Sequence, residues 1–115
     1  MNNEETITAL KMYRSGWAND IRENWGFSPE ANVITLTLYE ISGCIVLALE
    51  QLHKHGRCRD KMAMVLLKKK LEKLVKSKIF DDFDLLGEIH ACGVVTSGTK
   101  HHIRVMFEAL EQLTA

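Results

Sequence analysis

Histidine and cysteine side chains are the groups in this sequence that could bind a metal ion. The chain has five histidines and three cysteines, and most of them fall in two short regions. The first region holds His53, His55 and Cys58, and the second holds His90, Cys92, His101 and His102. Imidazole and thiolate are zinc ligands, so a fold that brought the two regions to one end of a bundle would form a zinc site. Neither region has the HExxH, CxxC or CxxH spacing of a metal motif, and we therefore predict no metal and no cofactor.

Lysine side chains are concentrated in the middle of the chain. Residues 54–78 hold ten basic and two acidic side chains, although the whole chain carries no net charge. The candidate partner-binding residues are Lys68, Lys69, Lys73 and Lys76, of which the last three share one helical stripe. Such a ridge could contact an acidic protein surface or a phosphate backbone, or it could be a solvated face neutralised by acids on neighbouring helices.

The composition of this ridge bears on the choice between those partners. Over residues 54–78 lysine outnumbers arginine by eight to two, which argues against specific recognition of guanine edges. No aromatic side chain interleaves the ridge lysines, so stacking on single-stranded bases has no support. An acidic protein surface is therefore the favoured partner, and nucleic acid is the alternative.

Residues 83–107 superficially resemble a DNA-binding helix-turn-helix. The run GVVTSGTKHHIR looks like the turn and the reading helix, with Gly93 in the turn and Thr96–Arg104 in the groove. That alignment places Glu88, Thr99 and His102 at positions that should be apolar to hold the two helices together. An ordinary corner between two helices explains the stretch better.

The sequence has no arrangement typical of an active site. It lacks the strand-turn-helix elbow that holds a catalytic nucleophile and the glycine-rich loop that binds phosphate. Cys44 lies in an apolar segment, where a small core residue is the simplest interpretation. We therefore predict that the protein is not an enzyme.

Glu40 is an acidic residue in the middle of the same apolar segment. A buried carboxylate would need a partner such as Arg14, Arg22 or Tyr13, and an exposed one would face solvent through a gap between helices. Gly43, three residues further on the same face, would permit close approach of a neighbouring helix.

Helical spacing of apolar residues dominates the chain and must position all these groups. It predicts a bundle of about five helices, at approximately residues 4–25, 29–55, 58–78, 82–92 and 97–114. The clearest start signal is Ser28-Pro29-Glu30, and Gly56 ends the helix that follows it. The apolar set predicted for the third helix is Met62, Val65, Leu67, Leu71, Leu74 and Val75.

The second predicted helix is apolar on most sides. Its threonines and β-branched residues could also form a strand, but the strong start signal and the lack of a hairpin turn favour a helix. A helix that is apolar nearly all round is buried by its neighbours or by a second subunit, which makes a homodimer a further expectation.

Length and composition agree with one all-α domain spanning residues 1–115. Apolar residues make up 46% of the chain and charged residues 26%, as in an average globular protein. The longest uninterrupted apolar run, Cys44 to Leu49, is far shorter than the ~20 residues that span a bilayer. An odd number of cysteines and no basic-then-apolar leader favour a cytoplasmic protein with reduced thiols and no membrane contact.

These observations predict a small regulatory or adaptor protein that binds an acidic protein partner through the lysine ridge. The alternative is a nucleic-acid-binding regulator that uses the same ridge, with or without the segment 83–107.

Overall fold

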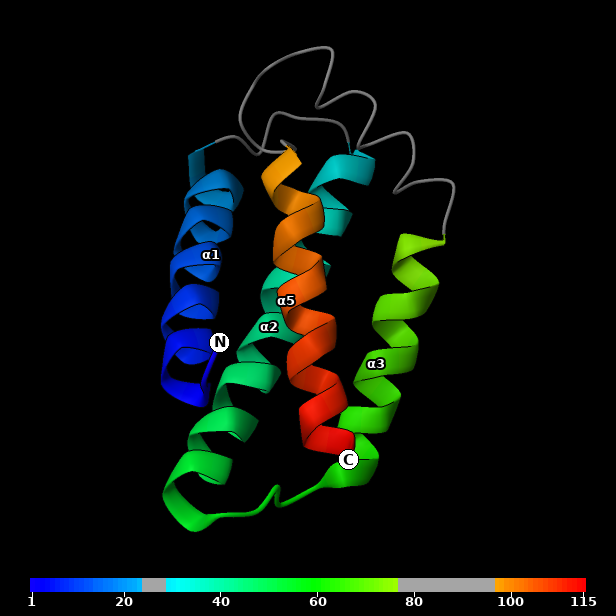
Figure 1. The fold of residues 1–115 in the computed structure, drawn as a ribbon. Helices are drawn as coiled ribbons and strands as arrows, with labels where there is room; N and C mark the ends of the chain where they lie inside the picture. Colours follow the sequence, from blue (N-terminus) through cyan, green and yellow to red (C-terminus); the bar gives the residue numbers. More distant parts are fainter. Residues whose placement is uncertain (24–28, 77–96) are drawn as a thin grey trace.

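The protein is an all-α bundle. The computed structural model describes residues 1–23, 29–76 and 97–115, and all regular structure in these ranges is helical. The helices are α1 (Asn3–Glu23), α2 (Pro29–His55), α3 (Lys61–Val75) and α5 (Ser97–Thr114) (Figure 1). The prediction of a helical bundle is confirmed. The helix predicted at 82–92, and the last two residues of the helix predicted at 4–25, lie outside the described residues.

The four helices run alternately up and down, and α5 lies between α1 and α3 in the view of Figure 1. The pair α1 and α2 has the most extensive contact, and α5 packs against all three other helices. Helix α3 packs mainly on α5, whereas it makes only limited contact with α2. One long side of α3 is therefore left facing away from the rest of the bundle.

The start of α3 differs from the prediction of residue 58. Gly56 has a positive φ of 73°, which ends α2, and the chain then stays non-helical as far as Asp60. The Asp60 side chain accepts a hydrogen bond of 3.0 Å from the backbone N–H of Ala63, so Asp60 is the N-cap. Because this cap fixes the first turn, α3 begins at Lys61. It ends at Val75, and the predicted last residue, 78, lies outside the described residues.

The core is built from apolar side chains of all four helices. Its largest fully buried apolar residues are Leu10, Ile34, Leu38, Ile41, Ile45, Leu49, Leu71, Met106, Leu110 and Leu113. The prediction that Met62 belongs to this core is wrong, since its side chain is 67% exposed and Met64 is buried instead. The reason is helical phase: Met64 is seven residues from Leu71 and shares its face, whereas Met62 is on the opposite side.

Helix α2 is buried on one side and exposes apolar residues on the other. Val33, Leu36 and Leu47 are its exposed large apolar residues. By length and composition alone, Asn32–His55 could cross a membrane, but half of its most apolar stretch is buried inside the bundle. The core helix of a helical bundle meets the same criteria, so the segment by itself does not assign a membrane span.

Candidate functional site

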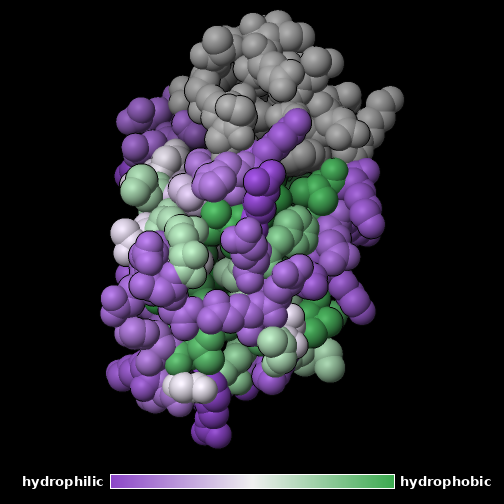
Figure 2. All heavy atoms as spheres, in the orientation of Figure 1, coloured by the Kyte–Doolittle hydropathy of each residue, from purple (hydrophilic) through white to green (hydrophobic). Residues whose placement is uncertain are grey.

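Three of the four predicted partner-binding lysines lie in a row on α3. Lys69, Lys73 and Lys76 are exposed and follow one another at helical spacing, on the side opposite Leu71. Hydrophilic side chains line the upper part of the edge of the molecule over α3, and hydrophobic ones lie toward its lower end (Figure 2). Lys68 is half-buried and lies on a different side of the helix, so the structure does not place it with the other three.

Two large apolar side chains continue this row toward the start of α3. Met62 and Leu66 are 67% and 59% exposed, and their spacing places them on the same stripe as the lysines. We call Met62, Leu66, Lys69, Lys73 and Lys76 the outer face of α3. The sequence interpretation missed its apolar half, although helical phase separates Met62 and Leu66 from Met64 and Leu71.

The lysines of the outer face have no acidic partner in the part of the chain that the structure describes. The ion pairs found there are Lys11–Glu50, at 3.8 Å, and His53–Glu4, at 3.3 Å, and both join α1 to α2. The interpretation of the ridge as a face neutralised by acids on neighbouring helices therefore gains no support from the described residues.

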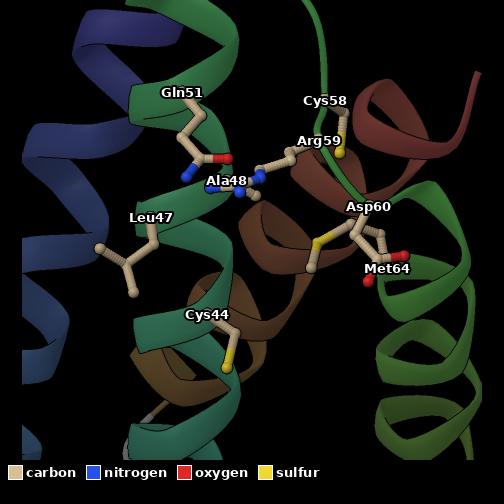
Figure 3. A pocket seen from close by; sticks show the side chains of 8 residues that line it. All are labelled: Cys44, Leu47, Ala48, Gln51, Cys58, Arg59, Asp60 and Met64. Atoms are coloured by element: carbon tan, nitrogen blue, oxygen red, sulfur yellow. The ribbon is translucent and has the colours of Figure 1, made fainter.

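A cleft of about 400 Å³ opens between α2 and α3 near their connection. Its lining residues are Cys44, Leu47, Ala48, Gln51, Cys58, Arg59, Asp60 and Met64 (Figure 3). Arg59 reaches from the connection across to α2, and the two thiols stand apart and are free. The prediction that Cys44 is a core residue is wrong, because its side chain is exposed on the open side of α2.

Arg14 is held against α2, but not by Glu40. Its Nε donates a hydrogen bond of 3.3 Å to the carbonyl oxygen of Tyr39, and its guanidinium carbon lies 4.2 Å from the centre of the Tyr39 ring. A Cβ at Gly43 would lie 2.8 Å from Arg14 Nη2, so this glycine makes room for the guanidinium. Glu40 is exposed, which is the second of the two alternatives considered for it.

The described members of the two histidine and cysteine regions lie at opposite ends of the bundle. His53, His55 and Cys58 lie where α2 turns into α3, whereas His101 and His102 are in the first turns of α5, at the other end (Figure 1). Among the described residues no three histidine, cysteine or acidic side chains are placed to hold a metal ion. His90 and Cys92 lie outside the described residues.

His102 packs among aromatic rings of α1. Its imidazole stacks on Tyr13, with ring centres 3.7 Å apart, and meets Trp17 edge-on at 5.9 Å. Its Nδ1 is buried and has no hydrogen-bond partner within the described ranges. Desolvation by this burial, and secondarily the charge of His101, lowers the pKa of His102 below the usual 6.5. His102 is therefore neutral in the folded protein at neutral pH.

This environment makes stability depend on pH. Below about pH 6.5 His102 is protonated more readily in the unfolded chain than in the fold, so the free energy of unfolding falls as the pH is lowered toward the folded-state pKa. Above pH 6.5 this contribution is fully present. The free energy of unfolding is measured with urea at about pH 7.5 and at about pH 5. Its fall between these two pH values should be smaller for His102→Phe than for the wild type. An equal fall in the free energy of unfolding in both proteins would contradict the assignment of this pH dependence to His102.

The helix-turn-helix alignment falls only partly within the described residues. Its turn at Gly93 and its first helix lie outside them. In α5, Ile103 and Met106 are buried in the core, whereas His101 and Arg104 are exposed. The buried side of α5 thus packs in the core of the bundle and is not available to a partner.

Comparison of the chain with protein-family models, with curated proteins and with solved structures finds no match.

Proposed function

We propose that this protein is a non-enzymatic regulatory or adaptor protein that binds an acidic protein partner through the outer face of α3. The observation that carries the proposal is the row of Lys69, Lys73 and Lys76, exposed and unpaired within the described residues. A row of like charges repels itself, and an acidic surface laid against it relieves that repulsion.

The spacing of the lysines indicates the kind of acidic surface. At 1.5 Å per residue, Lys69 and Lys73 are about 6 Å apart along the axis of α3, and Lys76 follows about 4.5 Å later. Carboxylates three and four residues apart on a partner helix have the same spacing. Such contacts lie at the surface, so binding should weaken strongly as salt is added.

Charge reversal tests the proposal directly. We expect K69E/K73E/K76E to bind a polyglutamate peptide of about 20 residues at least tenfold more weakly than the wild type, because attraction becomes repulsion. The measurement is fluorescence anisotropy at about 50 mM and about 200 mM salt. A matched control, K54E/R57E/R104E, makes the same change in net charge at exposed positions outside the outer face and should bind nearly as the wild type does.

Three results would count against the proposal. The first is no binding of polyglutamate to the wild type even at low salt. The second is an equal loss of affinity in both triple variants, which would show a net-charge effect. A mixed-sequence DNA duplex of about 20 base pairs is titrated in parallel. The third is that the wild type binds the duplex more tightly than the peptide and that K69E/K73E/K76E no longer binds the duplex. This result would establish the nucleic-acid alternative instead.

A further inference from the structure

The outer face of α3 changes from apolar to basic along its length, and this change indicates the kind of partner that would fit it. Toward the start of the helix the face presents Met62 and Leu66, 67% and 59% exposed, and toward the end it presents lysines only. Resting on the function proposed above, we infer that the partner segment is an amphipathic helix with large apolar side chains at one end and carboxylates at the other.

The dimensions of the face suit one helix. From Met62 to Lys76 it extends about 21 Å along the axis, which a partner helix of about four turns would cover. The residues of the face recur at alternating steps of four and three, the pattern along which two helices pack side by side at a small angle. The apolar end of the partner would remove Met62 and Leu66 from water, and its acidic end would lie over the lysines.

The charge layout also sets the direction of the partner. Carboxylates are most favourable in the first turns of a helix, where the backbone dipole is positive. The acidic end of the partner is therefore its N-terminal end, and it lies at the C-terminal end of α3. The two helices run antiparallel.

A nucleic acid and a membrane fit this face less well. Phosphate backbones need the lysines but gain nothing from exposed Met62 and Leu66. A helix that lies in a membrane surface inserts an apolar side along its whole length. In α3 the long apolar side, with Met64 and Leu71, is buried in the bundle, so only two apolar residues at one end could insert.

The test uses two synthetic helical peptides on an alanine background. The leucine peptide carries glutamates in its N-terminal half and two leucines on the same face of its C-terminal half, and the alanine peptide has alanine in place of those leucines. We expect wild-type protein to bind the leucine peptide about tenfold more tightly than the alanine peptide. M62A/L66A should lose this preference but bind the alanine peptide and polyglutamate as the wild type does.

A matched variant controls for loss of exposed apolar surface in general. V33A/L47A removes two apolar side chains on α2 that are 56% and 66% exposed, and it should retain the preference for the leucine peptide. A peptide with the two halves exchanged should bind more weakly than the leucine peptide, and equal binding would refute the antiparallel direction.

Other outcomes separate failure of this inference from failure of the proposed function. If the two peptides bind the wild type equally, or if V33A/L47A rather than M62A/L66A loses the preference, the amphipathic partner on α3 is wrong while the acidic partner stands. If no acidic peptide binds, the proposed function itself fails. The remaining alternative is a membrane surface, which is tested by sedimentation with phosphatidylcholine vesicles containing phosphatidylserine. If the protein binds these vesicles and the binding requires Met62 and Leu66, the partner is a membrane surface and not a helix.

Discussion

Replacing Trp17 with alanine should lower the free energy of unfolding by about 4 kcal/mol, because it removes the largest side chain between α1 and α5. Trp17 is 4% exposed and lies in the aromatic group at this contact, with ring centres 6.4 Å from Tyr13 and 5.9 Å from His102. Truncation leaves a cavity beside the imidazole of His102, which would keep its stacking on Tyr13 but lose its edge-on contact with the indole. The expected decrease in the free energy of unfolding therefore has two sources, the lost burial of the indole and its lost ring contacts.

Urea unfolding followed by far-ultraviolet circular dichroism measures this loss. Met12→Ala is the matched control, since Met12 is on the same helix but 66% exposed, and its truncation should change stability by less than about 0.5 kcal/mol. A Trp17→Ala protein within about 1 kcal/mol of the wild type would show that α1 is not anchored to α5 at this point.

Leu110→Ala is expected to cost about 3 kcal/mol, within the range for a fully buried leucine. Leu110 is completely buried in the core on α5, a helix that packs against all three other described helices. The same truncation at Leu66 on the outer face of α3, 59% exposed, should have almost no effect on stability.

The comparison between these two leucines also bears on the proposed partner. Thermal or urea unfolding of Leu110→Ala and Leu66→Ala under identical conditions gives both values. If Leu66→Ala were as damaging as Leu110→Ala, then Leu66 would be part of the core, and binding results for M62A/L66A would reflect misfolding. A stable Leu66→Ala protein leaves that residue available for a partner.

Much of the fold could be predicted from the sequence because its signals are local. Proline at position 29 and Gly56 bound α2 wherever the helix lies in the bundle, and the spacing of apolar residues defines α1 and α5. The predicted start of α3 was too early because the Asp60 side chain caps the helix, which begins at Lys61, three residues after the predicted position 58. That signal is also local and could have been recognised.

The candidate site also has a part that could be predicted from local sequence and a part that could not. The shared stripe of Lys69, Lys73 and Lys76 follows from helical spacing alone. The contacts of Arg14 with Tyr39 and of His102 with Tyr13 could not be predicted, because they depend on how neighbouring helices are rotated about their axes. The lack of acidic partners for the lysines among the described residues is likewise a property of the packed bundle rather than of any one segment.

The packing of α3 mainly on α5, which follows it in the chain, has a consequence for the order in which the protein is assembled during synthesis. Helices α1 and α2 are neighbours in sequence and have the largest mutual contact, so they can pair as a hairpin early. Among the described helices, α3 comes next but has little surface to pack on until α5, the last of them along the chain, has been translated. Until then the apolar side of α3, with Met64 and Leu71, stays exposed, and this is the interval in which the nascent chain most needs protection from aggregation.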